Sequence, residues 1–175
     1  MSKKKGFILL IIVILISGLN FAADRISKVY AVDHIKGKGT IEVVGRVFIM
    51  HYAENDGAFL GFGGNMPKPL KSVLLVLLPS IIVLAAVFYT AFSGNIPPGQ
   101  LVSLSCVIGG GMGNLWDRIF NDGIVIDFLN FGIGNLRTGI LNVADLSVTF
   151  GAIVFIILQF RAENNKDKIT DIETD

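Results

Sequence analysis

The sequence predicts a membrane α-helical protein with four transmembrane helices. Of its 175 residues, 52% are apolar and only 17% are charged, whereas a soluble domain carries about a quarter charged residues. The mean hydropathy is +0.65, and four apolar segments approach the length of roughly 20 residues that a spanning helix needs. We therefore expect a single membrane domain over residues 1–175.

The first predicted helix covers residues 6–23 and follows the basic start MSKKK. A short apolar core after basic residues is also typical of a cleaved signal peptide. However, no clean small-x-small cleavage site follows, and the apolar run continues to Ala23. The sequence thus favours an uncleaved signal anchor over a removed signal peptide.

The other three helices are predicted at about residues 72–92, 100–118 and 140–160. Pro79 lies inside the second of them, where a kink is tolerated if neighbouring groups satisfy the freed carbonyl. Gly109 and Gly113 form a G-x-x-x-G pattern in the third, which lets helices approach closely. We expect that pattern to serve helix packing rather than phosphate binding.

The basic residues before the first helix place the N-terminus in the cytoplasm. Four spans then return the C-terminus to the same side, and residues 24–71 and 119–139 become extracytoplasmic segments. The stretch TIEVVGRVFIMHYAEN, within 24–71, is rich in β-branched and aromatic residues and predicts short strands. The polar tail 161–175 is expected to be disordered. The net charge of +1 indicates no nucleic-acid partner.

Polar residues gather at the predicted outer ends of the helices. Ionisable groups beside membrane helices usually face the protein interior and mark function, although caps and interhelical ion pairs are the alternative for any single one. Asp117 adjoins Arg118, and Asp24 lies near Lys28, so ion pairing is expected for both carboxylates. The full set is Asp24, Asn114, Asp117, Arg118, Asp127, Asn142 and Asp145.

Asp127 and Asp145 are the two carboxylates whose local sequence is most apolar. Burial raises a carboxyl pKa, and two nearby carboxyls do not easily both ionise. Such a pair can share one proton and act as general base and general acid at neutral pH. The sequence therefore predicts aspartic-protease chemistry without assigning the proton to either residue.

Other chemistries are less well supported. His34 and His51 are too few and too far apart in the sequence for a zinc site, and adjacent Ser27 and Lys28 point apart in a helix or a strand. Cys106 has the character of a small packing residue. Two functional alternatives remain: a small transporter or proton-relay protein using Asp145, and a non-catalytic assembly subunit.

Five sequence blocks, taken together and in order, carry a resemblance to a known family. The chain resembles lipoprotein signal peptidase, or signal peptidase II, over roughly residues 7–160. The blocks are DRISK (24–28), NDGAF (55–59), GGGMGNLWDR (109–118), VIDF (125–128) and LNVADLSV (141–148).

The resemblance implies an aspartic endopeptidase of the bacterial inner membrane, with its active site at the outer face and both termini in the cytoplasm. It would cleave diacylglyceryl-modified prolipoproteins N-terminal to the lipidated cysteine, as a monomer among membrane lipids, with no metal or organic cofactor. The implied fold is a four-helix membrane bundle with a small β-cradle and an outer helical loop. The implied roles are catalysis for Asp127 and Asp145, substrate binding or site support for Asn55, Gly57, Asn114, Arg118 and Asn142, and structural support for Asp24, Lys28 and Asp117.

The sequence departs from the family pattern at three apolar positions. Phe59 and Leu60 follow the N-x-G-A block where the family usually has Ala-Phe, and Leu141 replaces a usual Phe. These changes keep the site apolar, so they bear on substrate fit rather than on chemistry. Phe59, Leu141 and Val143 are candidates to line a route for acyl chains, with core packing as the equal alternative.

Overall fold

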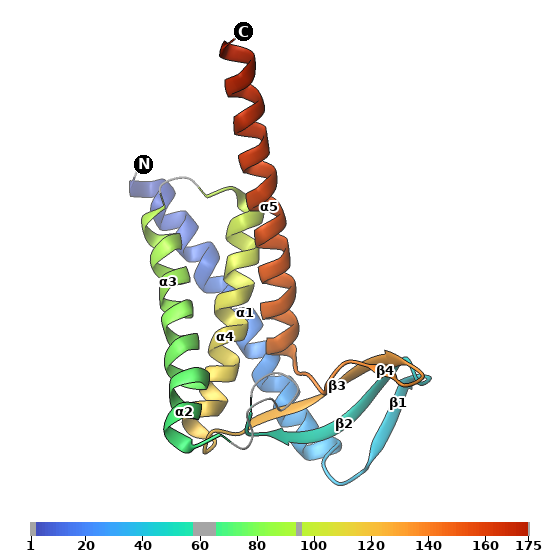
Figure 1. Ribbon diagram of the computed structural model, residues 1–175. Helices are drawn as coiled ribbons and strands as arrows, with labels where there is room; N and C mark the ends of the chain where they lie inside the picture. Colours follow the sequence, from blue (N-terminus) through green and yellow to red (C-terminus); the bar gives the residue numbers. More distant parts are fainter. Residues whose placement is uncertain (1–2, 58–65, 94–95, 175) are drawn as a thin grey trace.

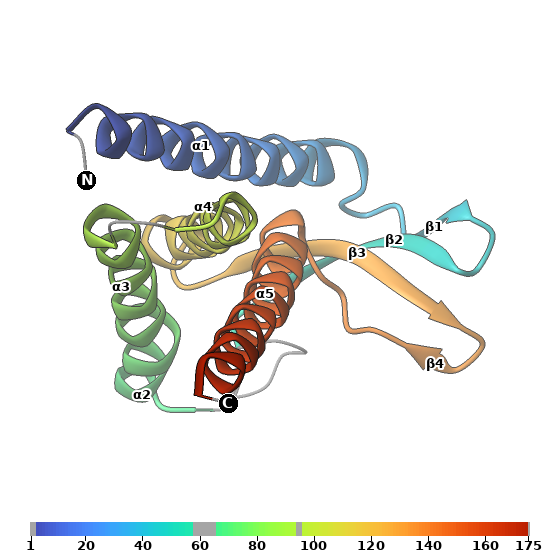
Figure 2. The same cartoon turned by 90° about the horizontal axis from the view of Figure 1, so that it is seen from above.

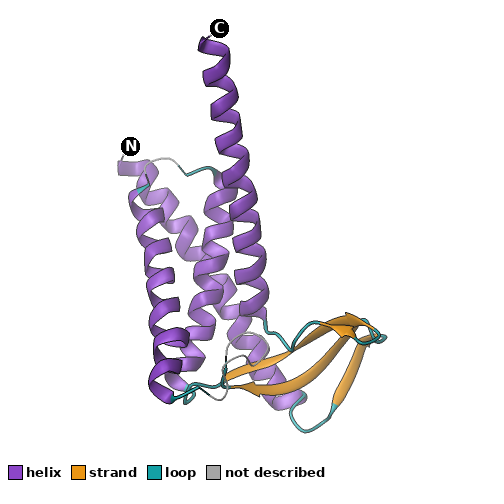
Figure 3. Ribbon diagram, viewed as in Figure 1, coloured by secondary structure: helices purple, strands orange, loops and turns teal. Residues whose placement is uncertain are grey.

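Four long helices pack side by side, and a small antiparallel sheet extends from one end of them (Figure 1, Figure 3). The structure is a computed structural model that describes residues 3–57, 66–93 and 96–174, with side chains for 6–57, 66–93 and 96–164. Among the described residues, three helical segments are long and apolar enough to cross a membrane, which confirms the membrane helical class. They are Gly6–His34, Lys68–Phe92 and Val143–Asn164.

The first helix, α1, runs over Lys3–His34 and is longer than the predicted 6–23. The prediction ended it before Asp24 because charged residues are costly in a membrane helix. In the structure Asp24 and Lys28 are fully buried and pair with each other one turn apart. Since their charges neutralise each other inside the protein, the helix continues through them.

The predicted 72–92 helix is a composite of three elements. A short helix α2 (Lys68–Ser72) leads into a π-helical turn η2 (Val73–Leu77) and then into α3 (Leu78–Phe92). Pro79 has no N–H to donate to a carbonyl of the preceding turn. The wider turn, in which the Leu78 N–H donates to the Val73 carbonyl, is the local adjustment that keeps the segment helical.

Helix α4 (Pro98–Phe120) lies between α1 on one side and α3 and α5 on the other (Figure 2). It is not among the three apolar spans, because its buried face carries serines, glycines and amides. Two of these glycines are contact points. A Cβ on Gly109 would lie 2.5 Å from the Ser17 carbonyl oxygen in α1, and one on Gly113 would lie 2.6 Å from Asp24 Oδ2. The predicted packing role of the G-x-x-x-G pattern is confirmed.

Replacing Gly110 with Ala is expected to destabilise the bundle by about 1–3 kcal/mol, as overpacking typically does. A Cβ there would lie 2.6 Å from the backbone oxygen of Ala144 in α5. Because this atom belongs to the backbone, the clash cannot be relieved by rotating a side chain. Thermal unfolding in detergent measures the loss. Gly18→Ala is the matched control: it has nothing within 4 Å, and Ala is the better helix former. Equal melting temperatures for the two variants would contradict the close α4–α5 contact.

The sheet contains four strands in the order β1-β2-β3-β4, all antiparallel to their neighbours. The hairpin of β1 (Thr40–Val44) and β2 (Phe48–Asn55) confirms the strands predicted there. The loop between α4 and α5 also forms strands, β3 (Val125–Ile133) and β4 (Leu136–Arg137). The expected outer helical loop is not found in the described part of the two outer segments, where α2 is the one short helix outside the bundle helices.

A compact apolar cluster fastens the sheet to the bundle. Ala31 and Ile35 of α1 pack against Phe128 and Leu129 of β3 and against Leu141, which precedes α5. Leu141 also exchanges backbone hydrogen bonds with Leu129 at 2.7 Å in each direction. The sheet is therefore held at the position where α1 ends and α5 begins.

The last helix, α5, covers Val143–Thr174. It begins later than the predicted residue 140 because Leu141 pairs with β3. It also continues as a helix over residues 161–174 of the tail that was expected to be disordered. Glu, Lys, Gln and Ala are good helix formers, and no Gly or Pro after Gly151 interrupts the helix, so helix propagation from the apolar half extends into the polar end.

Candidate active site

Asp145 lies in the first turn of α5 and, together with Asn142, caps this helix. The Asn142 backbone N–H donates to Asp145 Oδ2 at 3.1 Å, and the Asp145 N–H donates to Asn142 Oδ1 at 2.9 Å. This reciprocal arrangement is a capping box, which satisfies two backbone donors that a helix start otherwise leaves unpaired. The local sequence NVAD thus explains why a carboxylate lies at the start of an apolar helix.

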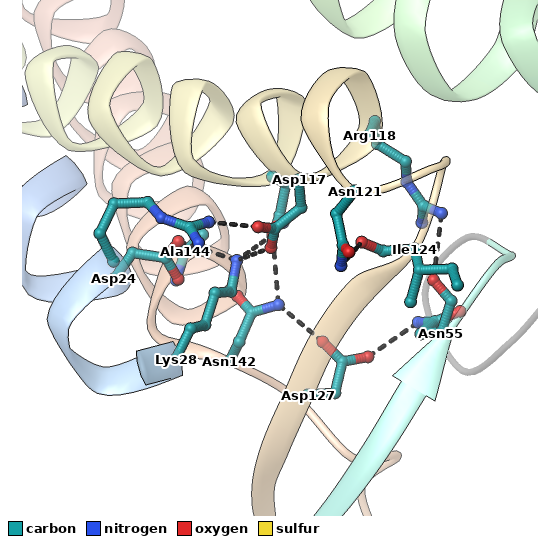
Figure 4. Close-up of polar contacts among 12 residues, drawn as sticks. Asp24, Lys28, Asn55, Asp117, Arg118, Asn121, Ile124, Asp127, Asn142 and Ala144 are labelled. Carbon is teal, nitrogen blue, oxygen red and sulfur yellow. Dashed lines mark hydrogen bonds and ion pairs between the residues drawn. The ribbon is translucent and has the colours of Figure 1, made fainter. Parts of the chain in front are cut away.

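Asp127 lies on β3 with its side chain buried to 2% exposure. Its two oxygens accept from two amides: Asn55 Nδ2 of β2 donates to Oδ2 at 2.8 Å, and Asn142 Nδ2 donates to Oδ1 at 2.7 Å (Figure 4). Asn142 therefore bonds both carboxylates, Asp127 through its amide nitrogen and Asp145 through its backbone. Asn142 thus links the sheet to the start of α5 by hydrogen bonds, in addition to the apolar cluster.

Asn114 of α4 separates Asp145 from a buried cation. Its Nδ2 donates to Asp145 Oδ1 at 2.8 Å, while its Oδ1 accepts from Lys28 Nζ at 3.1 Å and from Asn142 Nδ2 at 3.2 Å. Lys28 can only donate to the Asn114 side chain, and Asp145 accepts from it, so these partners fix which end of the amide is the oxygen. The ammonium of Lys28 acts on Asp145 through one amide rather than through a direct ion pair.

A buried charge cluster supports the site from the α1 side (Figure 4). Lys28 Nζ lies 2.8 Å from Asp24 Oδ2 and 2.7 Å from Asp117 Oδ2, and all three side chains are at most 1% exposed. Asp24 Oδ1 also accepts the backbone N–H of Ala144 at 3.0 Å. Asp24 therefore holds the first turn of α5, next to Asp145.

The cation partners of Asp117 differ from those expected from sequence. Its neighbour Arg118 was the expected partner, yet Arg25 of α1 and Lys28 make the ion pairs with Asp117. Consecutive residues of a helix point in different directions, so Arg118 faces away from it. Arg118 instead donates to the backbone carbonyls of Asn55, at 3.1 Å, and of Gly57 and Gly123. It ties the end of β2 to the turn before β3.

Both carboxylates line one cavity of about 300 Å³ between the bundle and the sheet. Asn55, Asn114 and Arg118 supply its other polar groups, and its remaining walls come from η2, α3, α4, β3, α5 and the segment before α5. They are Leu75, Pro79, Ile82, Val83, Val107, Gly111, Leu115, Val125, Ile140, Leu141 and Val148. The site combines a small polar end with a larger apolar space, the usual design of a pocket that binds an apolar ligand and orients it by a few polar contacts.

Most of the catalytic and substrate-binding residues expected at the site line the cavity, but Gly57, Asn142 and Val143 are not among its lining residues. Phe59 and Leu60 lie outside the described residues. Val143 packs against the apolar cluster beneath the sheet instead, so of the candidates for an acyl route Leu141 is the one that lines the cavity among the described residues.

The surroundings of Asp127 raise the pKa of its carboxyl to about 6. Burial is the largest cause and the negative charge of Asp145 adds to it, while the hydrogen bonds from Asn55 and Asn142 oppose the shift. Every hydrogen-bond donor that the described residues direct at either carboxylate is a neutral amide. A pair without direct cation partners keeps one proton more easily than two ion-paired carboxylates do.

This arrangement has relatives among known proteins. The profile of the family described as signal peptidase (SPase) II matches residues 9–161. The chain belongs to the signal peptidase II family. Similar sequences include lipoprotein signal peptidases from Chlorobium phaeovibrioides, 37% identical over 79% of this chain and 83% of the relative, and from Borrelia duttonii, 34% identical over 85% and 88%.

The fold is likewise similar to solved structures. A bacterial membrane enzyme determined by the in meso method at 2.3 Å resolution matches with a TM-score of 0.77 and 27% identity over 88% of this chain and 90% of that one. A second, at 1.9 Å, gives 0.70 and 25% identity. Membership of the signal peptidase II family makes the chain a peptidase and does not favour the transporter alternative.

Two contributors to the site were not predicted from the sequence. Arg25 pairs with Asp117 of α4, which is distant in the sequence. The Ala144 N–H, which donates to Asp24, is a backbone group and leaves no mark in the sequence. Helical spacing offered one clue to Arg25: it lies three residues before Lys28 and shares a helix face with it, so both cations reach the same carboxylate.

Proposed function

We propose that Asp127 and Asp145 are the catalytic pair of an aspartic endopeptidase that removes signal peptides from diacylglyceryl-modified prolipoproteins. The observation that carries this proposal is the position of Asn142, which bonds both carboxylates at the wall of one cavity. Membership of the signal peptidase II family supports the reaction and the substrate class.

The proposed chemistry needs one proton shared by the pair. The ionised carboxylate takes a proton from water, whose oxygen attacks the scissile carbonyl, and the protonated carboxyl donates to the carbonyl oxygen. When the resulting diol collapses, the protonated carboxyl donates to the leaving amine and the ionised carboxylate takes a proton from a diol hydroxyl, so the pair again holds one proton. Asn55, Asn114 and Asn142 hold the four oxygens in place, so little reorganisation is needed during the reaction.

The apolar part of the cavity fits the lipid of the substrate. Ile82 and Val83 of α3 and Val148 of α5 lie on its walls, where acyl chains replace contacts with the bilayer. We assign this space to the diacylglyceryl group, which then places the peptide bond before the lipidated cysteine at the carboxylates. Asn55, Gly57 and Arg118 support the strand end beside that bond.

We propose that four helices span a bacterial inner membrane: the three apolar spans and, in addition, α4. Both termini then lie in the cytoplasm. The 23 residues of α4 reach across a hydrocarbon core of about 30 Å at 1.5 Å per residue, and the lysines before α1 favour an inside N-terminus. The site then lies at the outer face, where the lipidated cysteine of a secreted precursor is found. A monomer suffices, since one chain contributes both carboxylates.

The purified chain, in detergent or vesicles, should cleave a prolipoprotein that carries the diacylglyceryl group and leave the unlipidated precursor intact. Mass spectrometry of the products should show a mature fragment that begins at the lipidated cysteine. Cleavage of both precursors at equal rates would contradict the role assigned to the apolar space. Cleavage of neither, by a protein whose thermal unfolding is cooperative, would contradict the proposed reaction.

The pH profile of the reaction should show a descending limb near pH 6. The pKa of Asp127 is raised to about 6, so as pH rises through that value the pair loses its shared proton and becomes doubly ionised. The parameter kcat/KM, which reports the free enzyme, should therefore fall across this range. A kcat/KM that instead rises through pH 6 would assign the chemistry to a single unprotonated carboxylate.

A further inference from the structure

Both hairpin turns of the sheet lie at its far end, away from Asp127. The β1–β2 turn follows Val44 and the β3–β4 turn follows Ile133, while Asn55 and Asp127 lie at the end next to the bundle. The two turns are joined to each other: the Gly132 N–H donates to the Val47 carbonyl at 2.9 Å, and Arg137 Nη1 donates to the Arg46 carbonyl at 2.6 Å. We call this end of the sheet the tip.

The tip is unusually apolar for a pair of turns. Outside the helices, the exposed large apolar residues of the described chain all lie there, and two of them are among the most exposed in the molecule. They are Val43, Val44 and Val47 at one turn, and Ile133 (77% exposed) and Leu136 (85% exposed) at the other. Turns in contact with water are normally polar, and a clustered apolar patch of this kind marks a contact surface.

The position of the tip indicates that the bilayer is the surface it contacts. Figure 1 shows β4 and the adjoining end of β3 at the level of the first turns of α5, whereas the turn between α1 and β1 lies farthest from the termini. The exposed apolar surface of α1 also continues through Ile26, Val29 and Val32 toward the sheet. The sheet therefore bends back to the depth at which the membrane-spanning segments begin.

We propose that the tip inserts into the interfacial region of the bilayer and forms a second membrane contact beside the helices. Ile133, Leu136 and the three valines enter the boundary between headgroups and acyl chains. Arg46 lies among them; its side chain is 89% exposed and forms a long, exposed ion pair with Glu42 at 3.6 Å. We expect it to exchange this partner for lipid phosphates by the extended geometry typical of interfacial arginines. Because β3 carries both Asp127 and Ile133, this contact sets the depth of the carboxylate relative to the substrate's lipid.

The test uses the single cysteine of the chain. In a Cys106→Ala background, Leu136→Cys and Lys38→Cys are each labelled with an environment-sensitive fluorophore and reconstituted into phospholipid vesicles that contain spin-labelled lipids. Insertion to about 5–10 Å, the usual depth of interfacial elements, predicts strong quenching at residue 136 by spin labels near the headgroup. Lys38 is exposed in the turn after α1, so its label should be quenched at least about twofold less.

Two results would overturn the proposal. Equal quenching at residues 136 and 38 would show that the tip lies no deeper in the bilayer than the turn after α1. Disulfide-linked dimers of unlabelled Leu136→Cys, with quenching that disappears as the protein is diluted in lipid, would assign the patch to a second copy of the chain. Thermal unfolding of each labelled variant confirms that it is folded, independently of any cleavage activity.

Discussion

Replacing either Asp127 or Asp145 with Asn is expected to abolish cleavage of a lipidated prolipoprotein. A single general acid or base contributes about 10²–10⁴-fold to a rate, and residues that act as a unit lose nearly all of it when one is removed. The expected loss for each single variant therefore lies at the upper end of that range. The double variant should be no worse than either single one.

Structural damage and lost chemistry are separable in these variants. In Asp145→Asn the side-chain oxygen can still accept the Asn142 N–H, so the helix start is kept. The new amide nitrogen then faces the donor Asn114 Nδ2, and thermal unfolding in detergent measures what the loss of that hydrogen bond costs. Asp33→Asn is the matched control, because Asp33 is an exposed carboxylate of α1 and should keep full activity. Full activity in either Asp127→Asn or Asp145→Asn would remove that residue from the catalytic pair.

Replacing Lys28 with Met is expected to cause the largest loss of stability, about 3–5 kcal/mol, which is typical when one partner of a buried ion pair is removed. Lys28 is fully buried and pairs with both Asp24 and Asp117, so its loss leaves two buried carboxylates of which only Asp117 keeps a cation, Arg25. At about 2–4 °C per kcal/mol for a chain of this size, the melting temperature in detergent should fall by roughly 6–20 °C.

The control for this variant is another lysine in an ion pair. Lys36 pairs with Glu54 at 2.7 Å, but both side chains are about half exposed. Exposed pairs contribute only about 0–1 kcal/mol, so Lys36→Met should melt close to the parent. Adding Asp24→Asn to Lys28→Met should recover part of the lost stability, because it removes one of the uncompensated charges. A Lys28→Met protein that melts with the parent would show that the cluster contributes no net stability.

Sequence patterns predicted those parts of the structure that depend on local composition. Apolar runs located the helices, alternating β-branched residues located β1 and β2, and the surrounding apolar residues singled out Asp127 and Asp145. These signals are carried by neighbours in the chain. The bounds failed where residues distant in the sequence decide them: α5 begins at Val143 rather than at residue 140 because Leu141 pairs with Leu129 of β3.

The bridging role of Asn142 illustrates a second limit. Its motif suggested support of the site, but the bonds from its amide to Asp127 and from its backbone to Asp145 depend on how β3 approaches α5. The same holds for Arg118, whose contacts with the carbonyls of Asn55 and Gly57 require β2 and α4 to meet. An Asn or Arg in a sequence shows that a side chain can form hydrogen bonds, but it does not show which residue is the partner.

The pairing of Asp24 with Lys28 inside α1 has a consequence for the biogenesis of the protein. Synthesis proceeds from the N-terminus, so α1 reaches the membrane before α4 has been translated. A lone carboxylate or ammonium would oppose the transfer of this helix into lipid, but the two groups lie one turn apart on a single helix and neutralise each other without help. Asp117 and Arg25 find each other only when α4 arrives, so that meeting belongs to assembly of the bundle rather than to insertion of its first helix.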